Sequence, residues 1–197
     1  AAFHFPDEVT ANVNAASAVM LTGDLKSAMI ISQKTALRNG RNRAIILLQN
    51  RRDTMQEYLT HSEAETEQAG ADFARALPDG KVVAMYGELG SGKTAFVRGM
   101  ARGMGLTCRV SSPTFTIVNE YEGPRELIHF DMYRLGSADE LFDIGWEDYV
   151  NRGSVCAVEW SENVEDAFYG DEVVVRFEKL GPTTRRIIIT EGSGKSC

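Results

Sequence analysis

The feature that most constrains this chain is a glycine-rich stretch near its middle, Gly87-Glu88-Leu89-Gly90-Ser91-Gly92-Lys93-Thr94. It matches the phosphate-binding loop pattern G-x-x-x-x-G-K-[ST] at every fixed position. It follows an apolar run at 82–86, typical of a buried strand, and precedes a stretch at 93–104 that predicts a helix. Because such a loop joins a strand to a helix in α/β proteins, the stretch predicts a P-loop fold.

Each residue type in this loop has a role in holding a nucleoside triphosphate. Gly87, Gly90 and Gly92 let the backbone amides turn inward around phosphate oxygens. The helix that follows directs the positive end of its dipole at the same anion. Lys93 can reach the β- and γ-phosphates, and the hydroxyl of Thr94 can ligate magnesium. The chain has no Asn-Lys-x-Asp guanine-reading motif, which favours ATP over GTP.

Two apolar strands are predicted to end in an acid. The segments 127–131 and 155–159 each place a carboxylate, Asp131 and Glu159, at the end of an apolar run, and the second has the Walker-B form. The carboxyl ends of parallel strands meet at the ligand crevice of an open α/β sheet. Either acid could therefore hold magnesium or orient the attacking water. The alternative is that such an acid faces solvent or caps a helix.

A polar segment with a proline, Ser111–Thr116, separates the predicted P-loop helix from the next strand. Nucleotide-sensing switch loops occupy this place in GTPase-like folds. Thr114 could sense the γ-phosphate directly or through the metal, or it could cap an ordinary turn. Arg134, soon after Asp131, could neutralise charge in the transition state or form a surface ion pair.

Two residues with rings lie next to the acids. Trp160 directly follows Glu159, so it could stack on a base, flank the metal site or belong to the core. His129 precedes Asp131 by two residues and would point to the face opposite Phe130. Because no cysteine or second histidine is near it in sequence, we expect no metal role for His129.

The remaining pattern places these motifs on a mixed sheet. Strands are expected at 57–60, 116–120, 127–131, 155–159, 173–177 and 186–190, and helices at 62–77 and 138–150. The first helix begins with Ser62-Glu63-Ala64-Glu65, a capping-box pattern in which Glu65 reaches back to the Ser62 amide. Strands alternate with helices at first, and strands follow one another at the end. This order predicts an α/β P-loop NTPase fold with a mixed, mostly parallel central sheet flanked by helices.

Charge and motif content divide the chain into three parts. Residues 1–54 hold more basic than acidic residues and no motif, so the net charge of −7 arises entirely in the remainder. We expect an extension of unknown role at 1–54, a P-loop ATPase domain at 55–191 and a flexible tail at 192–197. Within the extension, 44–49 could form a short strand or a buried helical turn. Met55 is the expected natural start.

Composition argues against several classes of protein. The acidic balance disfavours a duplex-DNA binder, which needs a basic surface. Cys108, Cys156 and Cys197 form no CxxC and no zinc-site spacing, so reduced thiols are expected. The longest aliphatic run, 44–48, is far too short for a membrane span, and no signal peptide is recognisable. We expect a cytoplasmic protein that binds neither membrane nor DNA.

Four motifs, in this order and at these spacings, resemble the TsaE family, the small bacterial ATPases of tRNA threonylcarbamoyladenosine synthesis. The resemblance extends from about Tyr58 to Thr190. It rests on the P-loop and on Ser112-Pro113-Thr114-Phe115-Thr116, His129-Phe130-Asp131-Met132-Tyr133-Arg134-Leu135 and Val158-Glu159-Trp160. Four ordered motifs are specific, whereas a P-loop alone would indicate only a nucleotide binder.

The resemblance implies a P-loop α/β fold that binds ATP and Mg²⁺ and hydrolyses ATP slowly. It also implies action on the TsaD–TsaB pair, which transfers the threonylcarbamoyl group to the adenosine beside the tRNA anticodon. ATP hydrolysis would reset that complex between turnovers, and the chain would meet tRNA only indirectly.

Roles for particular residues follow from the resemblance. Lys93, Asp131, Glu159 and Thr114 would be the catalytic group, with Thr94, Glu159 and Asp131 at the magnesium. Thr114 lies in the family's switch-like loop. The residues implied at the nucleotide are Glu63, Gly87, Glu88, Leu89, Gly90, Ser91, Gly92, Lys93, Thr94 and Trp160. Glu63 enters this set because it falls where the family's N-terminal segment approaches the nucleotide.

Two other functions are compatible with a P-loop. A small-molecule kinase usually adds a lid with several arginines, whereas the central region here offers only Arg125 and Arg134, with Arg152 further on. Phosphate released to water, with no phosphorylated acceptor, would argue against a kinase. A regulatory module would bind nucleotide and act through partner contact alone. Intact tRNA modification with a Lys93→Ala chain that no longer binds ATP would favour that module.

Overall fold

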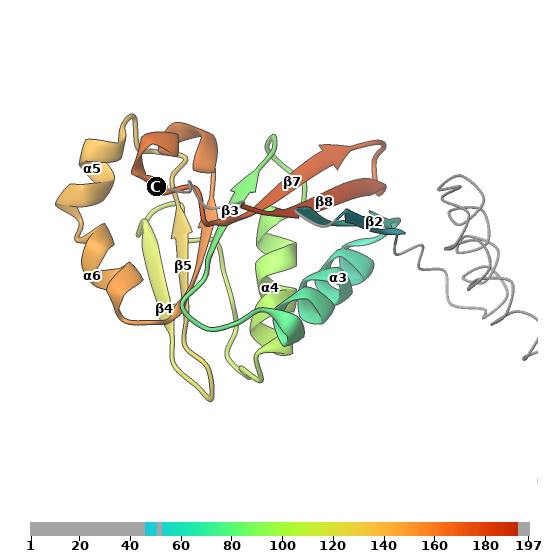
Figure 1. Ribbon diagram of the computed structural model, residues 1–197, viewed down its shortest axis with the longest axis horizontal. Helices are drawn as coiled ribbons and strands as arrows, with labels where there is room; N and C mark the ends of the chain where they lie inside the picture. Colours follow the sequence, from blue (N-terminus) through green and yellow to red (C-terminus); the bar gives the residue numbers. More distant parts are fainter. Residues whose placement is uncertain (1–45, 51–52, 193–197) are drawn as a thin grey trace, which may run out of the picture. The chain divides into compact units, whose positions relative to one another are not determined.

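The computed structural model describes residues 46–50 and 53–192. The described part is built on one sheet, whose strands are β1 (Ile46–Asn50), β2 (Asp53–Thr60), β3 (Val82–Tyr86), β4 (Val118–Tyr121), β5 (Leu127–Asp131), β6 (Val155–Glu159), β7 (Val173–Lys179) and β8 (Arg185–Glu191). Their spatial order is β1-β2-β8-β7-β3-β6-β5-β4 (Figure 1). The crossovers between β3, β6 and β5 are those of an α/β protein.

The sheet is parallel at its centre and antiparallel at both edges. β3 pairs in parallel with β6 and β7, and β5 pairs in parallel with β6. The pairs β4–β5, β7–β8 and β2–β8 are antiparallel. The predicted mixed α/β sheet is confirmed, with its parallel pairing confined to four central strands. Asp131 of β5 stands opposite Glu159 of β6, and Glu159 stands opposite Met85 of β3. The carboxyl-terminal ends of these three strands therefore lie at the same end of the sheet.

Helices cover both faces of the sheet and enclose two apolar clusters. The helices are α3 (Glu63–Ala76), α4 (Lys93–Gly103), α5 (Ala138–Asp143) and α6 (Trp146–Asn151), with short 3₁₀ turns η1 (Ser161–Asn163) and η2 (Glu165–Ala167). Figure 1 shows α3 and α4 side by side, away from α5 and α6. Phe73 of α3 and Phe96 of α4 pack together in the first cluster, at 5.6 Å between ring centroids. Trp146 of α6 packs on Phe130 of β5 in the second, at 5.2 Å.

The first helix begins as its capping pattern predicts, with one difference. The Ser62 hydroxyl accepts a hydrogen bond from the Glu65 amide at 3.2 Å. The Glu65 carboxylate reaches back to the His61 amide, at 2.9 Å, and not to that of Ser62. The first bond satisfies a backbone donor that a helix start leaves without a partner, and the second satisfies the amide of the residue before the cap.

Several other predicted elements differ in extent from the structure, including the strand expected at 57–60, which is Asp53–Thr60, and the strand expected at 173–177, which is Val173–Lys179. The helix expected at 138–150 is two short helices, because Gly145 takes a left-handed conformation (φ +85°) between them. The strand expected from 116 begins at Val118, because the amide of Ile117 closes a turn onto the Pro113 carbonyl at 2.6 Å. Of the segment 44–49, residues 46–49 belong to the strand β1, and residues 44 and 45 lie outside the described residues.

The domain division stays a prediction. The boundary expected after residue 54 falls inside β2, which starts at Asp53. Residues 193–197 of the tail expected at 192–197, and most of the expected extension, lie outside the described residues.

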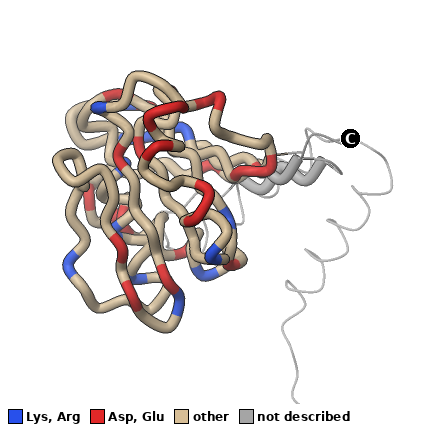
Figure 2. The backbone as a smooth tube through the Cα atoms, turned by 90° about the vertical axis from the view of Figure 1, so that its left-hand side faces the viewer, with Lys and Arg blue, Asp and Glu red and all other residues tan. Residues whose placement is uncertain are grey.

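Acidic residues outnumber basic ones in the described part of the chain. Red acidic segments predominate over blue basic ones along the described backbone in Figure 2. Among the described residues, no helix is both long enough and apolar enough to cross a bilayer.

Candidate functional site

The glycine-rich loop turns directly from the end of β3 into α4. Gly92 caps the helix in a left-handed conformation (φ +105°), which favours glycine. The Ser91 amide donates to the Glu88 carbonyl at 3.1 Å and closes the loop. A Cβ atom at Gly87 would lie only 2.8 Å from the Phe177 carbonyl oxygen, so the loop needs glycine here as well. The N-terminus of α4 therefore opens toward the hollow of the loop.

Lys93 lies inside this loop with its side chain almost wholly buried. Its ammonium donates to the carbonyl oxygens of Gly87 and Glu88, the latter at 3.3 Å. It also lies 3.9 Å from the centre of the Trp160 ring. Burial lowers the pKa of Lys93, although neighbouring carboxylates, Glu159 foremost, act in the opposite direction. The hydrogen-bond acceptors of the Lys93 ammonium are thus backbone carbonyl oxygens, which phosphate oxygens can replace.

The Glu159 carboxylate meets the first turn of α4. The Thr94 hydroxyl donates to Oε1 of Glu159 at 2.8 Å. The Nε2 atom of His129 lies 2.9 Å from the same oxygen. Glu159 is 3% exposed and His129 is fully buried. The contact arises because α4 packs on the face of β5 and β6 that carries both side chains.

The Asp131 carboxylate holds the loop that precedes β4. Its Oδ2 accepts hydrogen bonds from the hydroxyls of Ser112, at 2.8 Å, and Thr114, at 2.6 Å. Its Oδ1 accepts from the Tyr133 amide at 3.0 Å. Asp131 is therefore neither solvent-facing nor a helix cap: it connects the end of β5 to the predicted switch loop.

Trp160 lies between the lysine and an exposed tyrosine. Its ring centroid is 4.9 Å from that of Tyr133, and its backbone is left-handed (φ +59°). The residue is only partly buried and borders the site as well as the core. Arg134 forms no ion pair among the described residues, and its guanidinium lies 4.8 Å from the Phe115 ring centre. The predicted surface ion pair of Arg134 is therefore not seen.

Most of the predicted site residues converge, and one does not. The loop, Thr114, Asp131, Glu159 and Trp160 meet at one edge of the sheet. Glu63 pairs instead with Arg98 of α4, and it makes no contact with the loop among the described interactions. The Glu88 and Leu89 side chains are exposed, so only their backbone faces the loop.

Four further residues contact the site. Ser112 lies within a motif already singled out, and His129 was expected to have no role with a metal. The Glu162 carboxylate is 3.5 Å from the Gly87 amide, and the Arg185 guanidinium donates to the Gly90 carbonyl at 3.0 Å. No local sequence signal marks Arg185, because β8 reaches the loop only through the tertiary fold.

The donor set suits a hard cation assisted by phosphate. Among the described residues, no group of three or more His, Cys, Asp or Glu side chains could bind a metal alone. The Thr94 hydroxyl and the Glu159 carboxylate supply oxygen ligands beside the loop. Magnesium usually takes one or two carboxylates together with phosphate oxygens and water, so the site fits that ion and not a caged structural metal.

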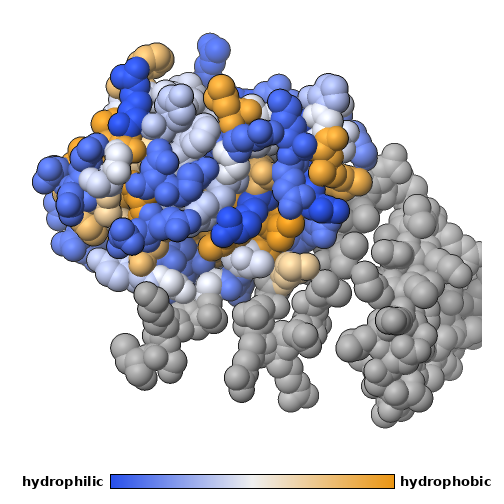
Figure 3. All heavy atoms as spheres, turned by 90° about the horizontal axis from the view of Figure 1, so that it is seen from above, coloured by the Kyte–Doolittle hydropathy of each residue, from blue (hydrophilic) through white to orange (hydrophobic). Residues whose placement is uncertain are grey.

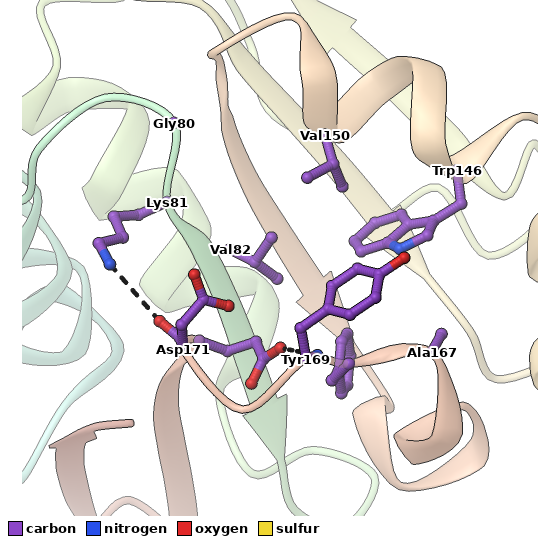
Figure 4. Close-up of a pocket in the computed structure, with 10 residues that line it drawn as sticks. Gly80, Lys81, Val82, Trp146, Val150, Ala167, Tyr169 and Asp171 are labelled. Atoms are coloured by element: carbon purple, nitrogen blue, oxygen red, sulfur yellow. Dashed lines mark hydrogen bonds between the residues drawn. The ribbon is translucent and has the colours of Figure 1, made fainter. Parts of the chain in front are cut away.

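A separate recess of about 230 Å³ opens near the start of β3, away from these residues. Lys81, Val82, Trp146 and Tyr169 are among its lining residues (Figure 4). None of the residues predicted to bind nucleotide lines this recess. Its position at the opposite end of β3 from the glycine-rich loop separates it from the chemistry above.

The surface around the glycine-rich loop carries isolated apolar side chains. Leu89 is 77% exposed, Phe115 84% and Tyr133 54%. Seen from above, the described surface is largely hydrophilic, with apolar residues in separate groups (Figure 3). Large apolar side chains are also exposed away from the loop, among them Phe142 at 38% and Tyr169 at 62%.

Comparison with known proteins gives one family. Residues 60–187 match the family described as threonylcarbamoyl adenosine biosynthesis protein TsaE. A protein from Treponema pallidum (strain Nichols), named tRNA threonylcarbamoyladenosine biosynthesis protein TsaE, is 37% identical over 131 residues, which is 66% of this chain and 97% of that protein. Its namesake from Bacillus subtilis (strain 168) is 36% identical over 135 residues, 68% of this chain and 84% of the relative.

A solved structure agrees with this match. The structure titled as the crystal structure of Bacillus subtilis YdiB superimposes with a TM-score of 0.62 at 29% identity. The match covers 73% of this chain and 89% of that one. The α/β fold with a mixed sheet flanked by helices is therefore shared.

Proposed function

The chain belongs to the TsaE family, whose members take part in tRNA threonylcarbamoyladenosine biosynthesis, and from this premise we propose that it is a magnesium-dependent ATPase. The observation that carries the proposal is the convergence of the glycine-rich loop, Lys93, Thr94 and Glu159 at one edge of the sheet. Hydrolysis of ATP would serve the modification of the adenosine beside the tRNA anticodon.

The loop supplies a phosphate cradle. The backbone amides between Gly87 and Lys93 and the start of α4 would bind the phosphate oxygens. Lys93 would exchange its carbonyl acceptors for the β- and γ-phosphates, and their negative charge would favour its charged form. The buried Ser91 hydroxyl, which has no hydrogen-bond partner among the described residues, would gain an acceptor from the same anion.

Thr94 and Glu159 would hold magnesium beside the γ-phosphate. The ion, when bound, neutralises charge that develops on the phosphate oxygens. Asp131 would orient the attacking water or the metal-bound water, and its bonds to Ser112 and Thr114 would couple that position to the switch loop. Trp160, over Lys93, would exclude solvent from the phosphate side of the site.

The partner of this activity would be the TsaD–TsaB pair. Exposed Leu89, Phe115 and Tyr133 next to the loop suit a partner contact that depends on the nucleotide. The acidic surface makes tRNA an indirect partner only. Co-purification with tagged TsaD–TsaB, with and without ATP and Mg²⁺, tests this part. We expect association in at least one nucleotide state, and its absence in all states would contradict the partner proposal.

Release of inorganic phosphate tests the ATPase. We expect Glu159→Ala to abolish magnesium-dependent release while part of the nucleotide affinity survives, because Lys93 and the loop amides remain. Glu147→Ala, at an exposed acid on α6, is the matched control and should behave as the unmodified chain. Unchanged turnover in Glu159→Ala would refute the metal assignment. Phosphate transferred to a metabolite, and not to water, would indicate a kinase.

A further inference from the structure

The imidazole of His129 is a polar group of the site that the ATPase proposal leaves unused. It lies on β5, fully buried, two residues before Asp131 and therefore on the same face of the strand. In the sheet register His129 stands opposite Ala157, whereas Glu159 stands two residues farther along β6. The ring therefore reaches Glu159 diagonally across two neighbouring strands.

Among the described residues, the imidazole of His129 makes a single hydrogen bond. Nε2 lies 2.9 Å from Oε1 of Glu159, while the buried Nδ1 has no partner among the described residues. Because an ionised carboxylate only accepts, Nε2 carries the hydrogen and donates it. An apolar side chain could fill this position without the cost of burying a ring nitrogen that lacks a partner. What an imidazole adds here is the bond to Glu159.

That bond restricts the carboxylate which faces the proposed magnesium. The Thr94 hydroxyl donates to the same Oε1 at 2.8 Å, so two donors from β5 and α4 fix one oxygen. Oε2 has no hydrogen-bond partner among the described residues. Hydrogen bonds to a ligating carboxylate orient it toward the metal, and their loss weakens metal binding.

We propose that His129 is a positioning residue that holds Glu159 in the orientation required for magnesium. The inference rests on the proposed ATPase function, since it concerns the acid assigned to the metal. It gives His129 no contact with the ion or the nucleotide.

A matched pair of substitutions separates positioning from packing. His129→Gln places an amide nitrogen near the position of Nε2, whereas His129→Asn places it near Nδ1 and removes the donor to Glu159. Mn²⁺ is titrated into each variant with a non-hydrolysable ATP analogue, and free Mn²⁺ is followed by electron paramagnetic resonance. We expect about 10- to 100-fold weaker Mn²⁺ binding in His129→Asn, and near-normal binding in His129→Gln. Affinity for the analogue in EDTA should stay unchanged in both.

The outcomes distinguish this proposal from the ATPase proposal. Normal Mn²⁺ affinity in His129→Asn would overturn the role of His129 and leave the ATPase intact. Equal losses in both variants, with unchanged thermal unfolding midpoints, would also overturn it. An unmodified chain that bound neither the analogue nor Mn²⁺ would instead refute the ATPase proposal itself.

If both variants unfold, a measurement on the unsubstituted histidine tests whether His129 donates to Glu159. The imidazole ¹⁵N–¹H spectrum of the unmodified chain should show the His129 hydrogen on Nε2. That signal should shift in Glu159→Gln. A hydrogen found on Nδ1 would overturn the proposal.

Discussion

At the scale of single residues, the two strand-end acids have different surroundings. Both oxygens of Asp131 accept hydrogen bonds from the segment around Ser112 and Thr114 or from the Tyr133 amide. Glu159 is bonded on one oxygen, by α4 and by His129. Asp131 therefore suits a link between the predicted switch loop and the site, whereas Glu159 retains an oxygen that could face the proposed magnesium.

The buried thiol of Cys156 should make the free energy of unfolding depend on pH in the alkaline range. Burial, with a smaller contribution from Glu126, raises the pKa of Cys156 from 9.0 to about 12. The unfolded thiol ionises above pH 9.0, while the folded thiol resists ionisation to about pH 12. Its contribution to stability is therefore complete below the lower value and is lost progressively between the two.

We expect the free energy of unfolding to fall less with alkaline pH in Cys156→Ala than in the unmodified chain. Urea unfolding under reducing conditions at about pH 8 and about pH 10.5 measures the difference. Cys108→Ala, at an exposed thiol, is the control and should follow the unmodified chain. Identical slopes in all three proteins would contradict the expectation.

At the scale of elements, α3 and α4 approach each other through glycines. A Cβ atom at Gly99 would lie 1.8 Å from the Glu67 carbonyl oxygen, and one at Gly103 would lie 2.3 Å from that of Ala71. Gly70 of α3 meets the Phe96 carbonyl in the same way, at 2.1 Å. Backbone contact along this seam fixes α4, and α4 in turn carries Lys93 and Thr94 into the site.

Gly99→Ala should destabilise the protein although alanine is the better helix former. The helix preference gains about 1 kcal/mol, but forcing the two backbones apart costs about 1–3 kcal/mol or more. Denaturant unfolding measures the net loss. At Gly181 an added Cβ meets only ordinary contacts at 3.8 Å, so Gly181→Ala is the matched control. A Gly99→Ala chain as stable as the control would show that the helices can separate at no cost.

At the scale of the whole molecule, the strand order decides where the site forms. β6, late in the sequence, lies between β3 and β5 and brings Glu159 beside both the loop and Asp131. Antiparallel strands then extend the sheet on both sides, and β8 returns Arg185 to the loop. The site thus depends on segments from residue 87 to residue 185.

A chain that begins at Met55 should bind a fluorescent ATP analogue as tightly as the full chain. Every described β2–β8 pair lies between Met55 and Thr60, and the described contacts of the site come from later residues. Fluorescence titration of both chains, with their thermal midpoints compared, provides the test. Binding about tenfold weaker, a difference of about 1.4 kcal/mol, would contradict the expected domain division.

Local patterns in the sequence predicted most of the elements. The strands at 82–86, 127–131 and 155–159 have the predicted bounds, because short apolar runs between breakers are strong local signals. The break at Gly145 and the turn before Val118 were missed, since each depends on the conformation of a single residue. The same local chemistry predicted the phosphate loop and the two acids.

The sequence by itself determined the family, the loop and the acids, because these depend on residue types at fixed spacings. Only the tertiary structure decided how they meet. In the tertiary structure Glu159 contacts His129 and Thr94. Both oxygens of Asp131 accept hydrogen bonds from neighbouring segments, and Glu63 pairs with Arg98. Such contacts join residues far apart in the chain, and parallel strand pairing and the α3–α4 seam create them. No local pattern encodes them, because each depends on packing across the whole sheet.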